Sequence, residues 1–220
     1  MDSFQQHYGH WVLAAFMIVI ASWIFYRYLA PRTWREWSRA GIVQAFIIAL
    51  YAEMYGFPLT IYLLTGFFGI DLPLSGYSGH LWVTLFGYGA IGAMVEMALG
   101  YVFLVAGVIL IIRGWREVYH ASREKRLATG GVYAMMRHPQ YTGILLALFG
   151  EGVVHWPTLL TLALFPVMVL LYVLLARREE KEMLATFGEE YRAYQRRVPM
   201  FLPRLAKWGR LFKGAEQAGK

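Results

Sequence analysis

The sequence of 220 residues contains no cysteine. This absence excludes disulfide bonds, thiolate nucleophiles and thiolate metal ligands. Charged residues are also scarce, at 16% of the chain, whereas 58% of the residues are hydrophobic and the mean hydropathy is +0.43. A soluble domain of this length cannot hide so much apolar surface from water. The composition therefore predicts an all-α polytopic membrane protein with a single membrane domain over residues 1–220.

Charge is almost absent from several long runs, and these runs mark the expected membrane spans. The first three spans are expected at about residues 11–28, 42–64 and 90–112. Two more follow at about 141–154 and 157–176, joined by a tight turn at His155-Trp156. The fourth run is short, roughly 21 Å as a helix, so it barely crosses a bilayer.

Basic residues are missing from one expected side of the membrane. The loop after the first span holds four, the segment 113–137 holds six and the segment 177–220 holds eleven, which together are all 21. The positive-inside rule then predicts five crossings with the N-terminus outside and the C-terminus in the cytosol. No basic residue precedes the first apolar run, so we expect a membrane helix there and not a cleavable signal. The expected location is a plasma or inner membrane, if the protein is bacterial.

The net charge of +7 does not indicate a nucleic-acid partner, because a basic cytosolic face is what anionic lipid favours. In the tail, residues 204–220, apolar side chains recur at helical spacing among basic ones, which predicts an interfacial amphipathic helix. We expect three parts within the domain: three spans in 1–112, a core in 113–203 and this basic tail.

One polar motif lies where the fourth span is expected to begin. Residues 130–143 read GGVYAMMRHPQYTG. Pro139 favours a helix start and keeps the preceding residue out of the helical conformation. Arg137 and His138 then lie at a helix N-terminus on the cytosolic side, where unpaired N–H groups and the helix dipole favour an anion. The glycines before them allow a tight turn of the backbone.

A second polar group lies where the fifth span returns to the same side. Glu179 and Glu180 follow that span, and a hairpin of the last two spans predicts that they lie near His138 and Tyr141. Tyr191 and Tyr194 follow at a spacing that places them on one helical face. Groups suited to anions, to ammonium and hydroxyl groups, and to aromatic stacking thus converge at one interface.

The motif GGVYAMMRHPQYTG, the Glu-Glu pair and the later run FGEEYRAYQRRVPMFLP closely resemble the isoprenylcysteine carboxyl methyltransferase family. Related patterns occur in membrane phospholipid methyltransferases, and the resemblance covers about residues 127–203. It implies an integral membrane enzyme that binds S-adenosylmethionine in a cytosol-facing pocket and releases S-adenosylhomocysteine. The cofactor-binding residues that it implies are His138, Tyr141, Glu179, Glu180, Gly131, Tyr133 and Tyr191. Arg137 and Arg197 match basic positions that orient the substrate or the cofactor carboxylate.

The sequence defines the molecule that accepts the methyl group less closely than it defines the binding site for the methyl donor. Methyl transfer to a carboxylate, as in a lipidated cysteine, would use Arg137 or Arg197 to orient that acceptor, whereas a phospholipid amine would need a nearby carboxylate as base. A small hydrophobic thiol is a third option. Glu53 lies within the second span beside Gly56 and Pro58, which should kink that helix. An ionisable residue at such depth is expensive, so we expect a functional role for Glu53 near the acceptor.

Other classes of protein remain open at this point. A transporter would place Glu53 and Glu96 on a conduction path, but five spans do not suit a pair of inverted repeats. A structural membrane protein would recruit partners through its basic tail. No metal is expected, since methyl transfer requires none and the histidines form no convincing ligand set. The expected partners are the bilayer and a lipophilic or lipid-linked acceptor.

Overall fold

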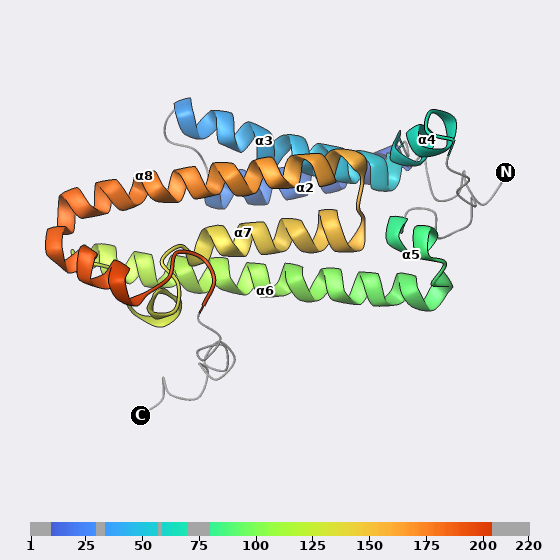
Figure 1. Cartoon of the computed structure of the whole chain (residues 1–220). Coiled ribbons are helices and arrows are strands. Elements are labelled where there is room, and N and C mark those ends of the chain that lie inside the picture. The colour runs from blue at the N-terminus through green and yellow to red at the C-terminus, as the bar shows by residue number, and fades with distance from the viewer. Residues whose placement is uncertain (1–9, 30–33, 57–58, 70–79, 204–220) are drawn as a thin grey trace. The chain divides into compact units, whose positions relative to one another are not determined.

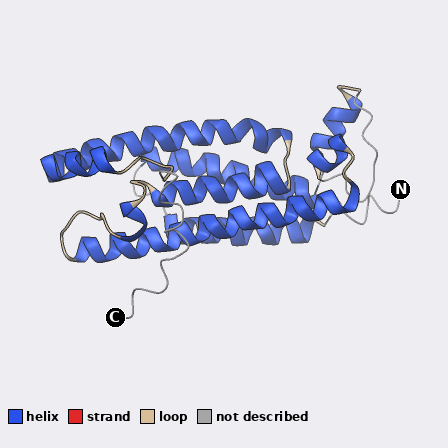
Figure 2. Ribbon diagram, turned by 60° about the horizontal axis from the view of Figure 1, so that its bottom comes forward, coloured by secondary structure: helices blue, strands red, loops and turns tan. Residues whose placement is uncertain are grey.

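The computed structural model describes the chain except for residues 1–9, 30–33, 57–58, 70–79 and 204–220. The described residues form helices joined by short connections and contain no strand (Figure 2). The all-α prediction is therefore confirmed. The expected amphipathic tail helix lies outside the described residues, as does Pro58 of the expected kink.

The helices follow one another along the chain as shown in Figure 1. The first part contains α2 (Trp11–Leu29), α3 (Trp34–Tyr51), the π-helical turn η1 (Ala52–Gly56), α4 (Leu59–Gly66) and α5 (Leu81–Phe86). The second part contains α6 (Gly89–Arg123), the 3₁₀ turn η2 (Gly131–Ala134), α7 (Pro139–Phe149), the π-helical turn η3 (Gly150–His155) and α8 (Leu159–Arg197).

The contacts within the chain divide it into two compact units. Unit 1 comprises Met1–Phe103 and Leu148–Val169, and unit 2 comprises Leu104–Ala147 and Leu170–Lys220. Each unit is described by itself below. All the cofactor-binding residues implied by the resemblance fall within unit 2.

Two of the described helices, α6 and α8, are long and apolar enough to cross a membrane. A third span is possible if Val43–Tyr55 and Leu59–Gly66, which meet at an angle of 72°, are counted together. The bend confirms the kink that was predicted near Gly56. The helix lengths and composition are those of a membrane protein, whereas the count of five crossings and the orientation stay predictions.

Two helices extend well beyond the apolar runs that predicted them. α6 continues to Arg123, past the expected end near residue 112, and α8 continues to Arg197, past the expected end near residue 176. Within α8, Gly188 has a left-handed φ of 55° and a ψ of −125°, and the helix axis turns sharply there (Figure 1). A hydropathy pattern locates only the apolar part of a helix, so it predicts the polar continuation of neither helix. The sequence predicted a helical face in this region only for Tyr191 and Tyr194.

In unit 2, α6 and α7 pack closely because glycines face each other. A Cβ atom on Gly107 would lie 2.4 Å from the carbonyl oxygen of Gly143, and one on Gly143 would lie 2.6 Å from the carbonyl oxygen of Gly107. Two turns further along α6, a Cβ atom on Gly114 would lie 2.9 Å from the Gln140 side chain. Small residues at such contacts are typical of helices that pack in membranes. This contact brings the start of α7 beside the polar end of α6.

Candidate functional site

The start of α7 is held by the chain segment that follows α8. Arg137 N–H donates to the carbonyl oxygen of Pro199 at 2.9 Å, and His138 N–H donates to that of Met200 at 3.0 Å. Thr142 Oγ1 also lies within hydrogen-bonding distance of the carbonyl oxygens of His138 and Phe201. These two main-chain donors are therefore used within the protein. Binding of an anion by the first turn of α7 itself stays a prediction.

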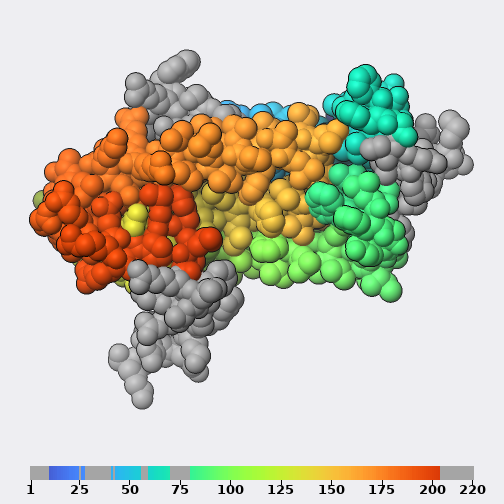
Figure 3. Space-filling view, viewed as in Figure 1, coloured from blue at the N-terminus to red at the C-terminus, as the bar shows by residue number. Residues whose placement is uncertain are grey.

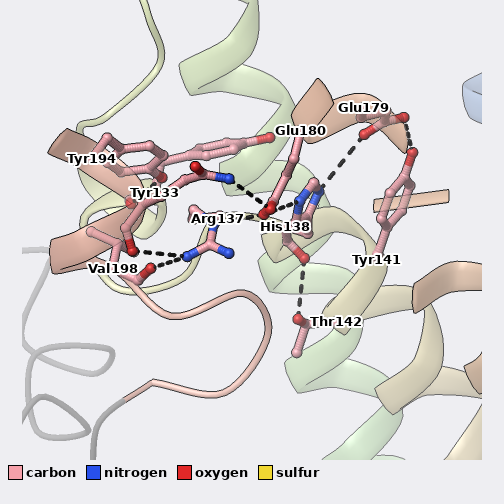
Figure 4. A network of polar contacts seen from close by, with 10 residues as sticks. Tyr133, Arg137, His138, Tyr141, Thr142, Glu179, Glu180, Tyr194 and Val198 are labelled. Atoms are coloured by element: carbon pink, nitrogen blue, oxygen red, sulfur yellow. Dashed lines mark hydrogen bonds and ion pairs between the residues drawn. The ribbon is translucent and has the colours of Figure 1, made fainter. Parts of the chain in front are cut away.

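Glu180 is the centre of a buried polar network (Figure 4). Its Oε1 accepts a hydrogen bond from Nε of Arg137 at 2.6 Å and lies 3.2 Å from Nε2 of His138. Its Oε2 accepts from the side-chain amide of Gln195 at 2.8 Å. A buried carboxylate needs such partners, since an unpaired buried charge is very costly. Glu180 thus joins the start of α7 to two stretches of α8.

Arg137 also holds the end of α8. Its Nη1 donates to the carbonyl oxygen of Gln195 at 3.2 Å and to that of Val198. The side chain is 11% exposed. A guanidinium group presents its donors in a rigid fork, which suits several acceptors held at fixed positions. Nε and Nη1 of Arg137 are therefore both engaged by the protein itself.

Glu179 differs from its neighbour in exposure and in partners. Its side chain is 40% exposed, compared with 9% for Glu180. The hydroxyl of Tyr141 donates to Glu179 Oε1, and Nδ1 of His138 lies 3.7 Å from Glu179 Oε2. The rings of His138 and Tyr141 are stacked in parallel with centroids 5.5 Å apart. The sequence prediction that the acidic pair lies near His138 and Tyr141 is confirmed in this structure.

Three tyrosines form an aromatic wall. The hydroxyl of Tyr194 donates to the main-chain carbonyl of Tyr133 at 2.7 Å, and the rings of Tyr191 and Tyr194 lie 5.8 Å apart. Burial, together with the negative charges of Glu179 and Glu117, raises the pKa of the Tyr133 phenol above its usual value. The Tyr133 side chain therefore stays neutral and can donate a hydrogen bond at physiological pH.

The glycine turn before α7 is fixed by a residue that sequence reasoning missed. Glu117 of α6 accepts hydrogen bonds from Gly130 N–H at 3.3 Å and from Nη1 of Arg126 at 3.1 Å. Gly131 has a left-handed φ of 52°, and a Cβ atom on Gly130 would lie 2.8 Å from Glu117 Oε1. The spacing between Glu117 and the glycines carries no local pattern, so only the folded chain shows their contact.

A cavity of about 600 Å³ opens beside these groups within unit 2. Six of the sequence-predicted site residues line it, namely Tyr133, Arg137, His138, Tyr141, Glu179 and Tyr191. Apolar side chains such as Met183 and Phe187 line another part, and the exposed cations Lys125 and Arg126 line it as well. Glu180 and Gly131 are not among the lining residues. In the space-filling view, the red segment after the kink of α8 surrounds a small opening in which yellow atoms of the segment before α7 are visible (Figure 3).

Two further predicted site residues, Arg197 and Glu53, are not among the residues that line this cavity. Arg197 is exposed, and its Nε donates to the main-chain carbonyl of Ala193 at 3.2 Å. Glu53 belongs to unit 1, where it is 6% exposed and its Oε2 accepts from Thr60 N–H at 2.9 Å. In the described part of the chain, no three His, Cys, Asp or Glu side chains are grouped as metal ligands would be.

These features define an all-helical membrane protein with a polar, aromatic cavity built from the ends of three helices. Residues 88–190 match the model of the phospholipid methyltransferase family. This match confirms the family resemblance inferred from the sequence. The matched region contains the whole stretch from the glycine turn to the Glu-Glu pair.

Three relatives illustrate the similarity. Methanethiol S-methyltransferase from Crocosphaera subtropica is 35% identical over 123 residues, which cover 50% of this chain and 46% of the relative. Protein-S-isoprenylcysteine O-methyltransferase B from Arabidopsis thaliana is 28% identical over 130 residues, or 58% of this chain and 63% of the relative. Cobalt-zinc-cadmium resistance protein CzcN from Cupriavidus metallidurans is 34% identical over 95 residues, or 43% of this chain and 44% of the relative.

The chain thus spans about half the length of the curated relatives it matches. No solved structure matches it. The relatives' names include acceptors as different as a small thiol and an isoprenylated cysteine.

Proposed function

We propose that this protein is a membrane-embedded methyltransferase that uses S-adenosylmethionine and acts on a membrane-associated acceptor. The cavity of about 600 Å³ in unit 2 is the observation that carries the proposal. Its volume lies in the range of pockets for small organic ligands, and it combines apolar walls with a few polar groups. We further propose that it opens to the cytosol, because basic residues flank it in the sequence.

The lining residues fit the parts of this cofactor. Glu179 offers carboxylate oxygens for hydroxyl or ammonium groups, and Lys125 offers positive charge for a carboxylate. The stacked rings of His138 and Tyr141, together with Tyr133 and Tyr191, offer flat surfaces for a nucleoside and for a cationic sulfur. A zwitterionic, aromatic and cationic ligand needs this mixture of groups in one cavity.

The chain's own residues have mainly to bind and orient. S-adenosylmethionine supplies an already activated methyl group, which an acceptor removes by in-line displacement. In our proposal, Tyr141 and Glu179 form one wall of the donor site, and Glu180 fixes His138 and Arg137 behind it. Positioning of two reactants in this manner, with water excluded, supplies a large part of the rate acceleration.

The contacts of Arg137 bear on the acceptor. Because Nε and Nη1 of Arg137 are used by Glu180 and by two carbonyl oxygens, we propose that Arg137 fixes the site instead of binding an acceptor carboxylate. This arrangement favours an acceptor that needs no arginine, such as a small hydrophobic thiol or an amine, over a lipidated cysteine carboxylate. Membranes incubated with donor carrying a labelled methyl group would distinguish these: label enters a volatile product, phospholipid or protein, respectively.

We expect the protein in lipid nanodiscs to bind S-adenosylhomocysteine, as measured by calorimetric titration. His138→Ala removes the ring that stacks on Tyr141 and contacts both glutamates, so we expect affinity to fall by a factor of ten or more. Arg192→Ala, which removes an exposed cation paired with Glu189, is the control and should leave affinity unchanged. Absence of binding to a folded wild-type protein would overturn the proposed function.

Glu53 is proposed to act on the acceptor and not on the donor. Its buried Oε1 has no hydrogen-bond partner among the described residues, so one oxygen remains available to a donor group. Glu53→Gln is expected to lower turnover by at least about tenfold while leaving S-adenosylhomocysteine affinity nearly unchanged. Steady-state kinetics and the same titration check this. Equal losses in both measurements would show that Glu53 serves cofactor binding or folding.

A further inference from the structure

Unit 1 contains a separate groove of about 760 Å³. Its lining comes from α5, α6, α7 and the turn after α7, and it is almost entirely apolar and aromatic. Among the lining residues are Trp82, Phe86, Tyr88, Val95 and Leu99. Of the described residues that line it, one carries a carboxylate, Glu96. A single acid in an apolar groove is an expensive feature to maintain in a membrane protein.

The carboxylate of Glu96 contacts one histidine, His80. Its Oε2 lies 3.2 Å from Nδ1 of His80, and the residue is only 9% exposed. The His80 ring lies 5.1 Å from the Trp156 ring and 5.8 Å from the His155 ring. The contact with His80 therefore orients the carboxylate of Glu96 at the groove.

A second histidine–glutamate pair lies beside the first. Nδ1 of His155 lies 3.2 Å from Oε2 of Glu151 in this pair. Oε1 of Glu151 is buried and has no hydrogen-bond partner in the described part of the chain. Each of these two buried carboxylates thus has one imidazole partner. Such an arrangement favours added positive charge over added negative charge nearby.

The aromatic wall of the groove suits the same charge. The indole N–H of Trp82 donates to the carbonyl oxygen of Val153 at 2.7 Å, which fixes that ring at the groove. Phe86 and Tyr88 have ring centroids 5.8 Å apart and line the groove as well. Aromatic faces attract cations, and most strongly where water is excluded.

We propose that this groove binds a lipophilic cation: an amphiphile whose positively charged amine or onium group lies against Glu96 and whose apolar part fills the aromatic groove. The carboxylate of Glu96 favours a ligand with a positive charge, and the apolar walls of the groove favour a ligand with a hydrophobic part. The proposed site lies within unit 1.

Tetraphenylphosphonium and tetraphenylborate test this charge selection, because they match in size and shape and differ in sign. Binding to protein in nanodiscs is measured against empty nanodiscs. We expect Glu96→Gln to weaken tetraphenylphosphonium binding by about tenfold or more, and not to weaken tetraphenylborate binding. Unchanged tetraphenylphosphonium binding in a folded Glu96→Gln protein would overturn the proposal, as would equal losses for both ions.

A second pair of variants decides the matter if Glu96→Gln does not fold. Val95→Trp places a large side chain in the groove, whereas Val102→Trp makes the same change at an exposed position of α6 outside its lining. We expect loss of tetraphenylphosphonium binding in the first and not in the second. Similar binding by both variants would overturn the proposal. Thermal unfolding of both proteins confirms that each is folded.

Discussion

Replacement of Glu180 by alanine is expected to abolish S-adenosylhomocysteine binding and to destabilise the protein by about 3–5 kcal/mol. Glu180 is the shared partner of Arg137, His138 and Gln195. Its removal leaves the Arg137 guanidinium buried without its carboxylate, and an uncompensated buried charge is strongly destabilising. Thermal unfolding in nanodiscs and calorimetric titration measure the two effects.

Glu182→Ala is the matched control on the same helix. The Glu182 side chain is 60% exposed and pairs with Arg178. An exposed pair of this kind contributes about 0.5 kcal/mol or less, so this variant should bind normally. A Glu180→Ala protein with normal stability and normal binding would show that the buried network has no role in the site.

Gly107→Val is expected to separate α6 from α7 and so to disrupt unit 2. A Cβ atom on Gly107 would lie 2.4 Å from the carbonyl oxygen of Gly143 and 2.8 Å from the main-chain nitrogen of Ala147. Backbone atoms cannot yield as a flexible side chain can, so the helices must move apart. We expect a loss of about 3 kcal/mol or more in stability, with a loss of cofactor binding, because the start of α7 carries His138 and Tyr141.

Gly41→Val separates this clash from the general effect of valine in a helix. Gly41 lies in α3, and a Cβ atom there would meet nothing within 4 Å. Both variants lose a glycine and gain a β-branched residue, so their difference in thermal stability measures the contact between α6 and α7. If Gly107→Val were as stable as Gly41→Val, the close packing described here would be wrong.

The contact between Tyr141 and Glu179 was predictable, because it depends on rules that apply to short stretches of sequence. Proline after Arg137-His138 starts a helix, and a hairpin of two apolar helices returns the Glu-Glu pair to that start. Those two rules suffice to bring Tyr141 and Glu179 together, as the structure shows. The overall class was predictable from composition for the same kind of reason, since so apolar a chain has few alternatives to membrane helices.

The sequence did not predict which of two neighbouring glutamates lines the cavity and which is buried behind it. Glu179 and Glu180 are adjacent and identical in type, yet only Glu179 lines the cavity, because successive residues on a helix point in directions about 100° apart. Glu117 was missed because its partner Gly130 is linked to it by a turn with no motif. Gly188 was missed as a kink, since the apolar pattern of α8 has ended well before it.

The two hydrogen bonds from the start of α7 to Pro199 and Met200 have a consequence for biogenesis. Residues 199 and 200 must leave the ribosome before Arg137 and His138 can form these two hydrogen bonds. The helices can therefore insert into the bilayer first, while the start of α7 is fixed only after residues 199 and 200 have been made. A nascent chain that stalls before residue 199 would be embedded in lipid and yet lack both contacts that hold the start of α7.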